Sequence, residues 1–141
     1  MEQLTFEEEV QRITLLLNKK MDLKVRERLL EEGITRFQYH ILLLIERNKQ
    51  VGVTELSSEM RVSPSAITPV VTRLYDLNLV HRYHSKEDRR KVIIEITEKG
   101  QKIVKEANQH VQTTIRELFS NYKEEDQQQF LRLCKKLNKN M

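Results

Sequence analysis

The fold is decided by residues 53–80, VTELSSEMRVSPSAITPVVTRLYDLNLV, which contain two short helical patterns with a polar turn between them. The first pattern runs from a Thr54 cap through Met60. The second begins at Ser63 and Pro64, because serine is a favoured cap and proline fits the first helical position, where its missing N–H is not needed. Two short helices joined by a turn of about four residues have the spacing of a helix-turn-helix.

The second of these helices has an apolar stripe formed by Ile67, Val71 and Leu74. Pro69 lies within its first turns and removes one backbone hydrogen bond. We therefore expect either a late helix start, capped by Ser65, or a local kink.

A β-hairpin is expected directly after the helix pair. Asn78 occupies the position where a left-handed residue ends a helix, and asparagine is second only to glycine there. Two strand-forming segments follow at residues 80–84 and 92–97, and the second alternates apolar residues with a period of two. The loop between them, at about residues 85–91, is longer than a tight turn requires and is a candidate functional segment.

Long helical patterns flank this region on both sides. The N-terminal pattern ends at Gly33, and a capping box of Thr35 and Gln38 starts a further helix. The C-terminal region begins at a Thr97 cap and breaks near Asn121. Apolar residues recur at helical spacing near both ends of the chain, namely Phe6, Val10, Ile13 and Leu17 in the first pattern and Phe130, Leu133 and Leu137 in the last.

The composition favours a single globular domain. The chain has 141 residues, of which 38% are hydrophobic and 33% charged, and its net charge of +4 suits phosphate or anionic-lipid partners. The apolar runs are too short to span a bilayer and the N-terminus is acidic, so we expect no membrane association and no export. Cys134 is the single cysteine, and its helical spacing with Phe130 and Leu137 favours a buried, inert thiol over a redox sensor.

The loop at residues 85–91 is strongly basic, with Lys86, Arg89, Arg90 and Lys91. Phosphates are the natural complement of such a tip, and arginine also suits the narrow minor groove of DNA. Composition alone favours a solvated turn, since most charged loops are no more than that. The position after a helix-turn-helix favours DNA binding instead, because the combination is a winged helix, with one helix for the major groove and a hairpin for the flanking DNA.

One succession of residues runs from the helix pair through the hairpin to the helix that follows: Leu56, Val62, Ser63, Ser65, Ala66, Ile67, Thr68, Arg73, Leu74, Leu79 and Val80, then Asp88, Arg90, Ile96, Thr97 and Gly100. In order and spacing it resembles the MarR family of bacterial transcriptional regulators, and the resemblance covers nearly the whole chain. It implies a mainly α fold with a small β-hairpin wing. A winged helix-turn-helix core would occupy residues 35–100, and dimerisation helices would occupy residues 1–33 and 101–141.

The resemblance also implies a function. The chain would be a homodimeric regulator, most often a repressor, that binds specific double-stranded DNA in the cytoplasm, at the nucleoid. It would need no cofactor. A small-molecule effector, often phenolic or anionic, would bind in a cleft between the dimer helices and the winged domain and weaken operator binding; the sequence does not identify that molecule.

Individual roles follow from the same resemblance. The D-x-R pattern of the wing falls on Asp88, Arg89 and Arg90, which makes Arg90 the minor-groove arginine. Asp88 would hold the wing by pairing with Arg73 of the recognition helix, and a protein-facing Asp88 is reasonable because an acidic residue that faced DNA would repel it. The expected DNA contacts are Ser63, Ser65, Thr68, Arg73, Lys86, Arg89, Arg90 and Lys91.

Hydroxyl groups gather at the start of the second helix. Ser63, Ser65 and Thr68 can reach phosphates or base edges there. Helix capping alone is an alternative role, and it is a stronger alternative for Ser63 than for the other two. Arg73 is the only basic residue between Pro64 and Leu77, so specificity should depend on hydroxyl contacts, methyl contacts and DNA shape.

The apolar stripes near the two termini exceed what a small winged core can cover. We expect them to form a homodimer interface, which would place two recognition helices on half-sites about one helical turn apart. The alternative is an ordinary intrachain core. The expected interface residues are Phe6, Val10, Ile13, Leu17, Phe130, Leu133 and Leu137.

Other classes of function have less support. His81 and His84 are three apart on a strand and face opposite sides, so we expect no metal site. The sequence has no glycine-rich phosphate loop and no plausible cysteine–histidine pair, so we expect no enzyme. The remaining alternative is a winged-helix module for protein interaction or assembly, whose basic wing is merely solvated.

Overall fold

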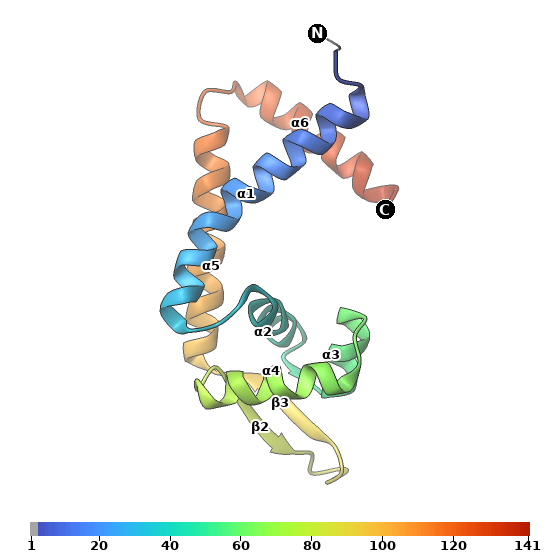
Figure 1. Ribbon diagram of the computed structural model, residues 1–141, viewed down its shortest axis with the longest axis vertical. Coiled ribbons are helices and arrows are strands. Elements are labelled where there is room, and N and C mark those ends of the chain that lie inside the picture. The colour runs from blue at the N-terminus through green and yellow to red at the C-terminus, as the bar shows by residue number, and fades with distance from the viewer. Residues whose placement is uncertain (1–2) are drawn as a thin grey trace.

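The computed structural model describes residues 3–141 and is mainly helical (Figure 1). Three antiparallel strands form its small sheet, so the expected fold, mainly α with a β-hairpin wing, is confirmed. The elements in chain order are α1 (Phe6–Glu32), α2 (Arg36–Asn48), β1 (Gln50–Val51), α3 (Val53–Met60), α4 (Pro64–Asp76), β2 (Val80–His84), β3 (Val92–Ile96), α5 (Glu98–Leu118) and α6 (Glu124–Lys139).

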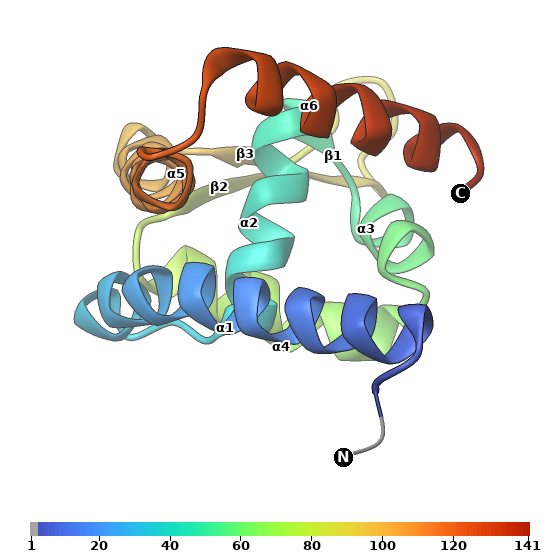
Figure 2. The same cartoon turned by 90° about the horizontal axis from the view of Figure 1, so that it is seen from above.

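The molecule has a winged part and a helical arm. Helices α2, α3 and α4 and the hairpin gather at the lower end in Figure 1, and α1 and α5 rise from them side by side. Helix α6 follows a turn at the far end of α5. In Figure 2, which looks down from above, α6 and the N-terminal half of α1 run across the view on opposite sides of its centre, and Figure 1 shows both at the far end of the arm. The arm therefore extends away from the wing.

The residues expected to begin or end helices are found at helix ends. Gly33 ends α1 in the left-handed conformation with φ 70°, and Asn78 has φ 59° after α4. Thr35 and Gln38 form the expected capping box: Thr35 Oγ1 accepts from the N–H of Gln38 at 3.2 Å, and Gln38 Oε1 accepts from the N–H of Thr35 at 2.9 Å. Thr97 Oγ1 likewise accepts from the N–H of Gly100 at 3.0 Å and caps α5.

Two expectations about the helix pair need correction. Helix α3 begins at Val53 with Gly52 at the capping position, so Thr54 lies inside the first turn and is not the cap. Helix α4 begins at Pro64 and continues through Pro69, so the expected late start is wrong. Proline fixes φ near its helical value, and the fold tolerates the one lost hydrogen bond at an exposed position.

The sheet has a strand that the sequence did not predict. β1 pairs with β3 through Gln50↔Glu95 and Val51↔Ile94, and the order is β1-β3-β2. A two-residue strand is too short to show alternation. Its addition makes β3 the central strand and ties the wing to the end of α2.

The core lies between α2, α4 and β3, and the inner ends of α1 and α5 pack on it. Gly100 lets α5 approach the hairpin closely, because a Cβ there would overlap the carbonyl oxygen of Leu79 and lie 2.7 Å from Ile96 Cγ1. The fully buried side chains include Leu29, Ile41, Leu42, Ile45, Leu56, Ile67, Leu74, Leu79, Ile94 and Ile103.

The outer ends of the arm are not part of this core. Every residue from Ser120 to Met141 is exposed in the protomer. Phe6 is 79% exposed and Leu137 61%, and Leu17 is partly buried. The alternative of an ordinary intrachain core is therefore wrong for these stripes. Cys134 is also exposed in the protomer, contrary to the expected buried thiol, because α6 packs against no core in the single chain.

Candidate nucleic-acid interface

The start of α4 presents three exposed hydroxyl groups. Ser63 occupies the capping position, but its side chain accepts no hydrogen bond from a backbone N–H of the helix. Its Oγ lies 2.9 Å from Ser65 Oγ instead. Thr68 Oγ1 donates to the carbonyl of Pro64 at 3.2 Å. The serine hydroxyls are thus not occupied by capping, and the first-turn N–H groups of α4 point in the same direction.

The wing loop at residues 85–91 is folded by its own hydrogen bonds. The N–H of Ser85 donates to the carbonyl of Lys91 at 2.8 Å, and the N–H of Lys91 donates to the carbonyl of Asp88 at 2.9 Å. Ser85 Oγ accepts from the N–H groups of Glu87 and Asp88 at 3.2 and 3.4 Å. Because both ends are fixed, the backbone of the loop is ordered while its basic side chains stay exposed.

Two residues that hold this loop were not expected from the sequence. His84 Nδ1 lies 2.8 Å from the carbonyl oxygen of Arg89, and Ser85 makes the turn described above. A serine directly after a strand is a typical turn residue, and this signal could have identified Ser85. The cationic residues Lys86, Arg89, Arg90 and Lys91 are all exposed.

Asp88 holds the wing, but its partner is not the one implied by the resemblance. Asp88 Oδ1 accepts from the backbone N–H of Arg90 at 3.1 Å and from Arg90 Nε at 3.2 Å. The side chain of Arg90 is still 92% exposed. The expected Asp88–Arg73 pair is wrong, because the loop closes locally and satisfies the carboxylate within three residues.

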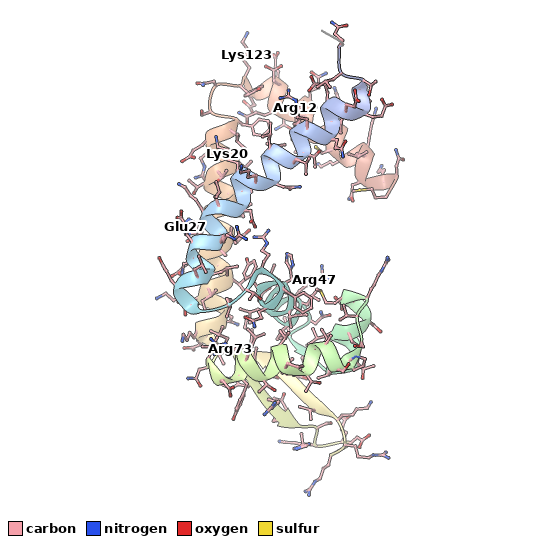
Figure 3. The ribbon with its side chains drawn as sticks, viewed as in Figure 1. Arg12, Lys20, Glu27, Arg47, Arg73 and Lys123 are labelled. Carbon is pink, nitrogen blue, oxygen red and sulfur yellow. The ribbon has the colours of Figure 1, made fainter. Side chains whose placement is uncertain are left out.

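The side chain of Arg73 points away from the wing, towards the C-terminal end of α1. Its Nη2 donates to the carbonyl of Gly33 at 3.2 Å, at the end of α1 (Figure 3). Nearby, Lys99 Nζ donates to the carbonyl of Leu77 at 3.2 Å and lies 3.9 Å from Glu32 Oε2. The C-terminal end of α4 is therefore tied to α1 and α5, and Arg73 serves that attachment.

A different arginine lies between α4 and the wing. The guanidinium carbon of Arg82, on β2, lies 4.8 Å from the centroid of the Tyr75 ring on α4. Its Nη1 donates to Thr72 Oγ1 at 3.4 Å. Sequence analysis missed this residue, because a cation–π contact between a helix and a strand leaves no periodic signal.

The outer face of the sheet has a polar row. Glu95 Oε1 accepts from Tyr83 Oη and from Gln50 Nε2, both at 2.6 Å. These two hydrogen bonds, that from Tyr83 first, lower the pKa of Glu95 below its usual value. Glu95 stays ionised and faces its partners rather than the tip of the wing.

A cleft of about 670 Å³ lies between α1, α2 and α5, where the arm meets the winged part. Its lining includes Tyr39, His40 and the cationic residues Arg36 and Lys105. Partial burial, reinforced by the positive charge of Arg36, lowers the pKa of His40. The imidazole is therefore neutral at neutral pH. The charged groups of the lining are Lys105, Arg36, which pairs with Asp22 at 2.8 Å, and the carboxylate of Glu46.

Neither a metal cluster nor a membrane span is found in residues 3–141. No group of three or more His, Cys, Asp or Glu side chains in this part of the chain could hold a metal ion. None of its helices combines the length and apolar character needed to cross a bilayer.

A helix-turn-helix with an exposed outer helix, followed by an ordered basic hairpin, defines a winged helix-turn-helix protein. The MarR family model matches residues 34–92. The uncharacterized HTH-type transcriptional regulator YpoP of Bacillus subtilis is 31% identical over 111 residues, which is 79% of each chain. The chain belongs to the MarR family. The relatives that it matches are named as helix-turn-helix transcriptional regulators.

Two further relatives give the extent of the match. The HTH-type transcriptional repressor MdtR of Bacillus subtilis is 31% identical over 84 residues, and this chain spans only 54% of its length. A solved structure of a MarR family protein from Bacillus stearothermophilus superposes with a TM-score of 0.81 at 26% identity, covering 94% of this chain and 93% of that one. The fold match thus includes the helical arm, which lies outside the matched family model.

Proposed function

We propose that the protein is a homodimeric repressor that binds a specific operator, with α4 in the major groove and the wing in the adjacent minor groove. The observation that carries the proposal is the pre-folded wing. Lys86, Arg89, Arg90 and Lys91 project from a loop closed by backbone hydrogen bonds, at the same end of the molecule as α4 (Figure 1). A loop that is already ordered loses little conformational entropy when it enters a groove.

Arg90 is the proposed minor-groove residue. Asp88 accepts a hydrogen bond from Arg90 Nε and so orients the guanidinium, while the side chain of Arg90 remains 92% exposed and can contact DNA. Ser63, Ser65 and Thr68 are the proposed contacts from the start of α4. Arg73 makes a smaller contribution to DNA than expected, since one of its nitrogens is bonded to Gly33.

Dimerisation would use the exposed ends of the arm, at residues 1–33 and 101–141. Phe6, Val10 and Ile13 on α1 are exposed, as are Phe130, Leu133 and Leu137 on α6. Leaving this much apolar surface in water is unfavourable, and a second copy would cover it. The dimer would carry two winged parts, which a single operator with two half-sites could bind together in the cytoplasm, at the nucleoid.

The cleft between α1, α2 and α5 is the proposed effector site. Lys105 and the Asp22-paired Arg36 supply positive charge, Glu46 supplies one negative charge, and Tyr39 and Val104 supply apolar surface; the proposed ligand is a small aromatic molecule whose anionic group binds beside Lys105. A ligand there would contact both the arm and the winged part. It would weaken operator binding if it favours an angle between them that the operator does not accept.

Binding to a duplex from the protein's own promoter region tests the proposal. We expect specific, salt-dependent binding by the unaltered protein and about tenfold weaker binding by Arg90→Ala. Lys123→Ala, at the far end of the arm (Figure 3), removes the same charge, and a variant whose mass equals that of the unaltered protein should also bind the duplex like it. Undiminished binding by Arg90→Ala would refute the wing's role. Failure of the unaltered protein to bind any duplex at low salt, together with a stable complex with another protein, would favour an assembly module instead.

A further inference from the structure

Arg82 points from the hairpin towards α4. Alternate residues of a strand share a face, so Arg82 lies on the same face of β2 as Val80. Val80 is 2% exposed, and the partner of Arg82 on β3 is Ile94, which is fully buried. The side chain therefore leaves the core side of the sheet at its edge and reaches across to Tyr75 and Thr72.

The charge of Arg82 is not neutralised by the protein. The ring of Tyr75 and the hydroxyl of Thr72 are uncharged partners, and no ion pair within residues 3–141 includes Arg82. A guanidinium has five N–H donors, of which Thr72 takes one. The stack on Tyr75 fixes the plane of the group while its other donors stay exposed to solvent.

The position between helix and wing determines what Arg82 can meet. The major and minor grooves of a duplex are separated by one sugar–phosphate strand. A protein with a helix in one groove and a wing in the next must straddle that strand, and a residue between the two elements faces its phosphates. Arg82 is an exposed cation at that position.

We propose that Arg82 binds a phosphate of the strand that separates the two grooves, and that Tyr75 and Thr72 are positioning residues for its guanidinium. The inference depends on the proposed mode of DNA binding and extends it. The contact reads no base, but it fixes how far α4 and the wing are displaced along the duplex relative to one another. It also supplies a cation that the recognition helix lacks, since Arg73 is turned towards Gly33.

The salt dependence of binding distinguishes this role from a purely structural one. Each phosphate contact releases about one counterion, so removing Arg82 from both protomers of a dimer should lower the slope of log K against log salt by about two. A residue that only braces the hairpin against α4 would alter thermal stability and leave this slope unchanged. Arg82→Lys keeps the charge and should restore the slope.

The experiment compares Arg82→Gln, Arg82→Lys and the control Lys123→Gln on one operator duplex and on its single-base variants, at several salt concentrations. We expect Arg82→Gln to bind every duplex more weakly by a similar factor, roughly tenfold, with the reduced slope. Lys123→Gln removes the same charge far from the wing, so this variant should retain the original slope once its mass is shown to equal that of the unaltered protein.

A second pair of variants tests the positioning role of the tyrosine. Tyr75→Leu removes the ring and should weaken binding, whereas Tyr75→Phe keeps the stack and should not. In the background of Arg82→Gln, Tyr75→Leu should cost no further affinity, because the side chain that the ring positions is already absent.

Three results would overturn the inference. They are an unchanged salt slope for Arg82→Gln, a loss of affinity that disappears on duplexes altered at one particular base pair, and additive effects of Tyr75→Leu and Arg82→Gln. These outcomes require that the unaltered protein binds duplex DNA. If it does not bind, the proposed function itself fails, so the two failures are distinguishable.

Discussion

Gly100 shows how one missing side chain sets the position of a helix. A Cβ at this position would overlap the carbonyl oxygen of Leu79 and crowd Ile96. We expect Gly100→Ala to lower the free energy of unfolding by about 1 to 3 kcal/mol, because the backbone of the hairpin would have to shift. Chemical denaturation measures this change.

Gly52→Ala is the matched control for that substitution. A Cβ at Gly52 would meet Glu55 Oε2 at 2.5 Å, and this atom is the end of a flexible side chain that can rotate away. The expected loss is smaller, below about 1 kcal/mol, and reflects mainly the poorer capping by alanine. Equal losses at both positions would show that crowding of the hairpin is not the cause.

Tyr83 controls the ionisation of Glu95. Its hydroxyl donates to Glu95 Oε1 at 2.6 Å and stabilises the carboxylate, so the pKa of Glu95 is lowered in the folded protein. We expect Tyr83→Phe to raise this pKa, and the carboxyl carbon shift followed by NMR against pH would report it. Tyr75→Phe, whose hydroxyl has no contact with Glu95, should leave the titration unchanged.

The sign of the stability effect follows from the lowered pKa. A carboxyl group whose folded pKa lies below its unfolded value stabilises the fold above the unfolded pKa, and this contribution is lost as the pH falls through the folded pKa. In Tyr83→Phe the two values are closer, so less of the stability depends on pH in the acid range. A Glu95 titration that is identical in the variant and the unaltered protein would contradict this account.

At the scale of one residue, the residues that begin and end helices were predictable from the sequence, and the long-range partners of side chains were not. Gly33, Asn78 and the Thr35–Gln38 box act through backbone conformation and neighbours within three positions, which a sequence displays directly. Arg73 was expected to pair with Asp88 and instead bonds Gly33, which is 40 positions away. Contacts of that separation depend on how elements pack, and a single sequence does not encode them in a local pattern.

Helix α4 carries a proline where a helix ordinarily needs an N–H. Pro69 cannot donate to the carbonyl of Ser65, yet α4 is continuous from Pro64 to Asp76. We expect Pro69→Ala to raise the free energy of unfolding by about 1 to 3 kcal/mol, since it restores one hydrogen bond and removes a ring clash. Urea denaturation would show the gain as a higher midpoint with an unchanged slope.

The same variant separates folding from DNA binding. If the ring of Pro69 touches a thymine methyl, Pro69→Ala would gain stability and lose affinity for the operator. Ala66→Ser, one turn earlier and also exposed, is a control for small changes on the surface of α4. A loss of stability in Pro69→Ala would show that the proline ring does not destabilise α4.

At the scale of elements, the four central helices and the hairpin were predictable because hydrophobic period and turn residues agree along this part of the chain. The strand β1 was not, because two residues cannot show a period. The start of α3 was misplaced by two residues, since a glycine and a threonine are both acceptable caps and stand two positions apart. The excess of apolar residues near the two termini was also predictable from the sequence, and most of these side chains are exposed in the protomer.

The outer ends of the arm form the proposed dimer interface. Leu137 on α6 is 61% exposed and belongs to the apolar stripe of that helix. We expect Leu137→Glu to convert the proposed dimer into monomers, because a carboxylate in a dry interface is strongly unfavourable. Analytical ultracentrifugation measures the mass, and operator affinity should fall with it, since a monomer holds a single half-site.

Lys139→Gln is the control for the dimer test. It changes the net charge by the same amount, but two positions along a helix point to nearly opposite sides, so it lies away from the stripe. Its mass should equal that of the unaltered protein. A dimer that persists in Leu137→Glu would place the interface elsewhere on the chain.

The hydrogen bond from Arg73 to the carbonyl of Gly33 joins the C-terminal end of α1 to α4, the proposed recognition helix. A rod of 27 residues is roughly 40 Å long, so a tilt of about 5° at its base displaces its tip by about 3 to 4 Å. A small rotation of α1 about its C-terminal end, beside α4, thus moves its N-terminal end by several ångströms. In the proposed dimer, joined at the outer ends of the arms, a change in the angle between the two α1 helices would also change the distance between the two α4 helices.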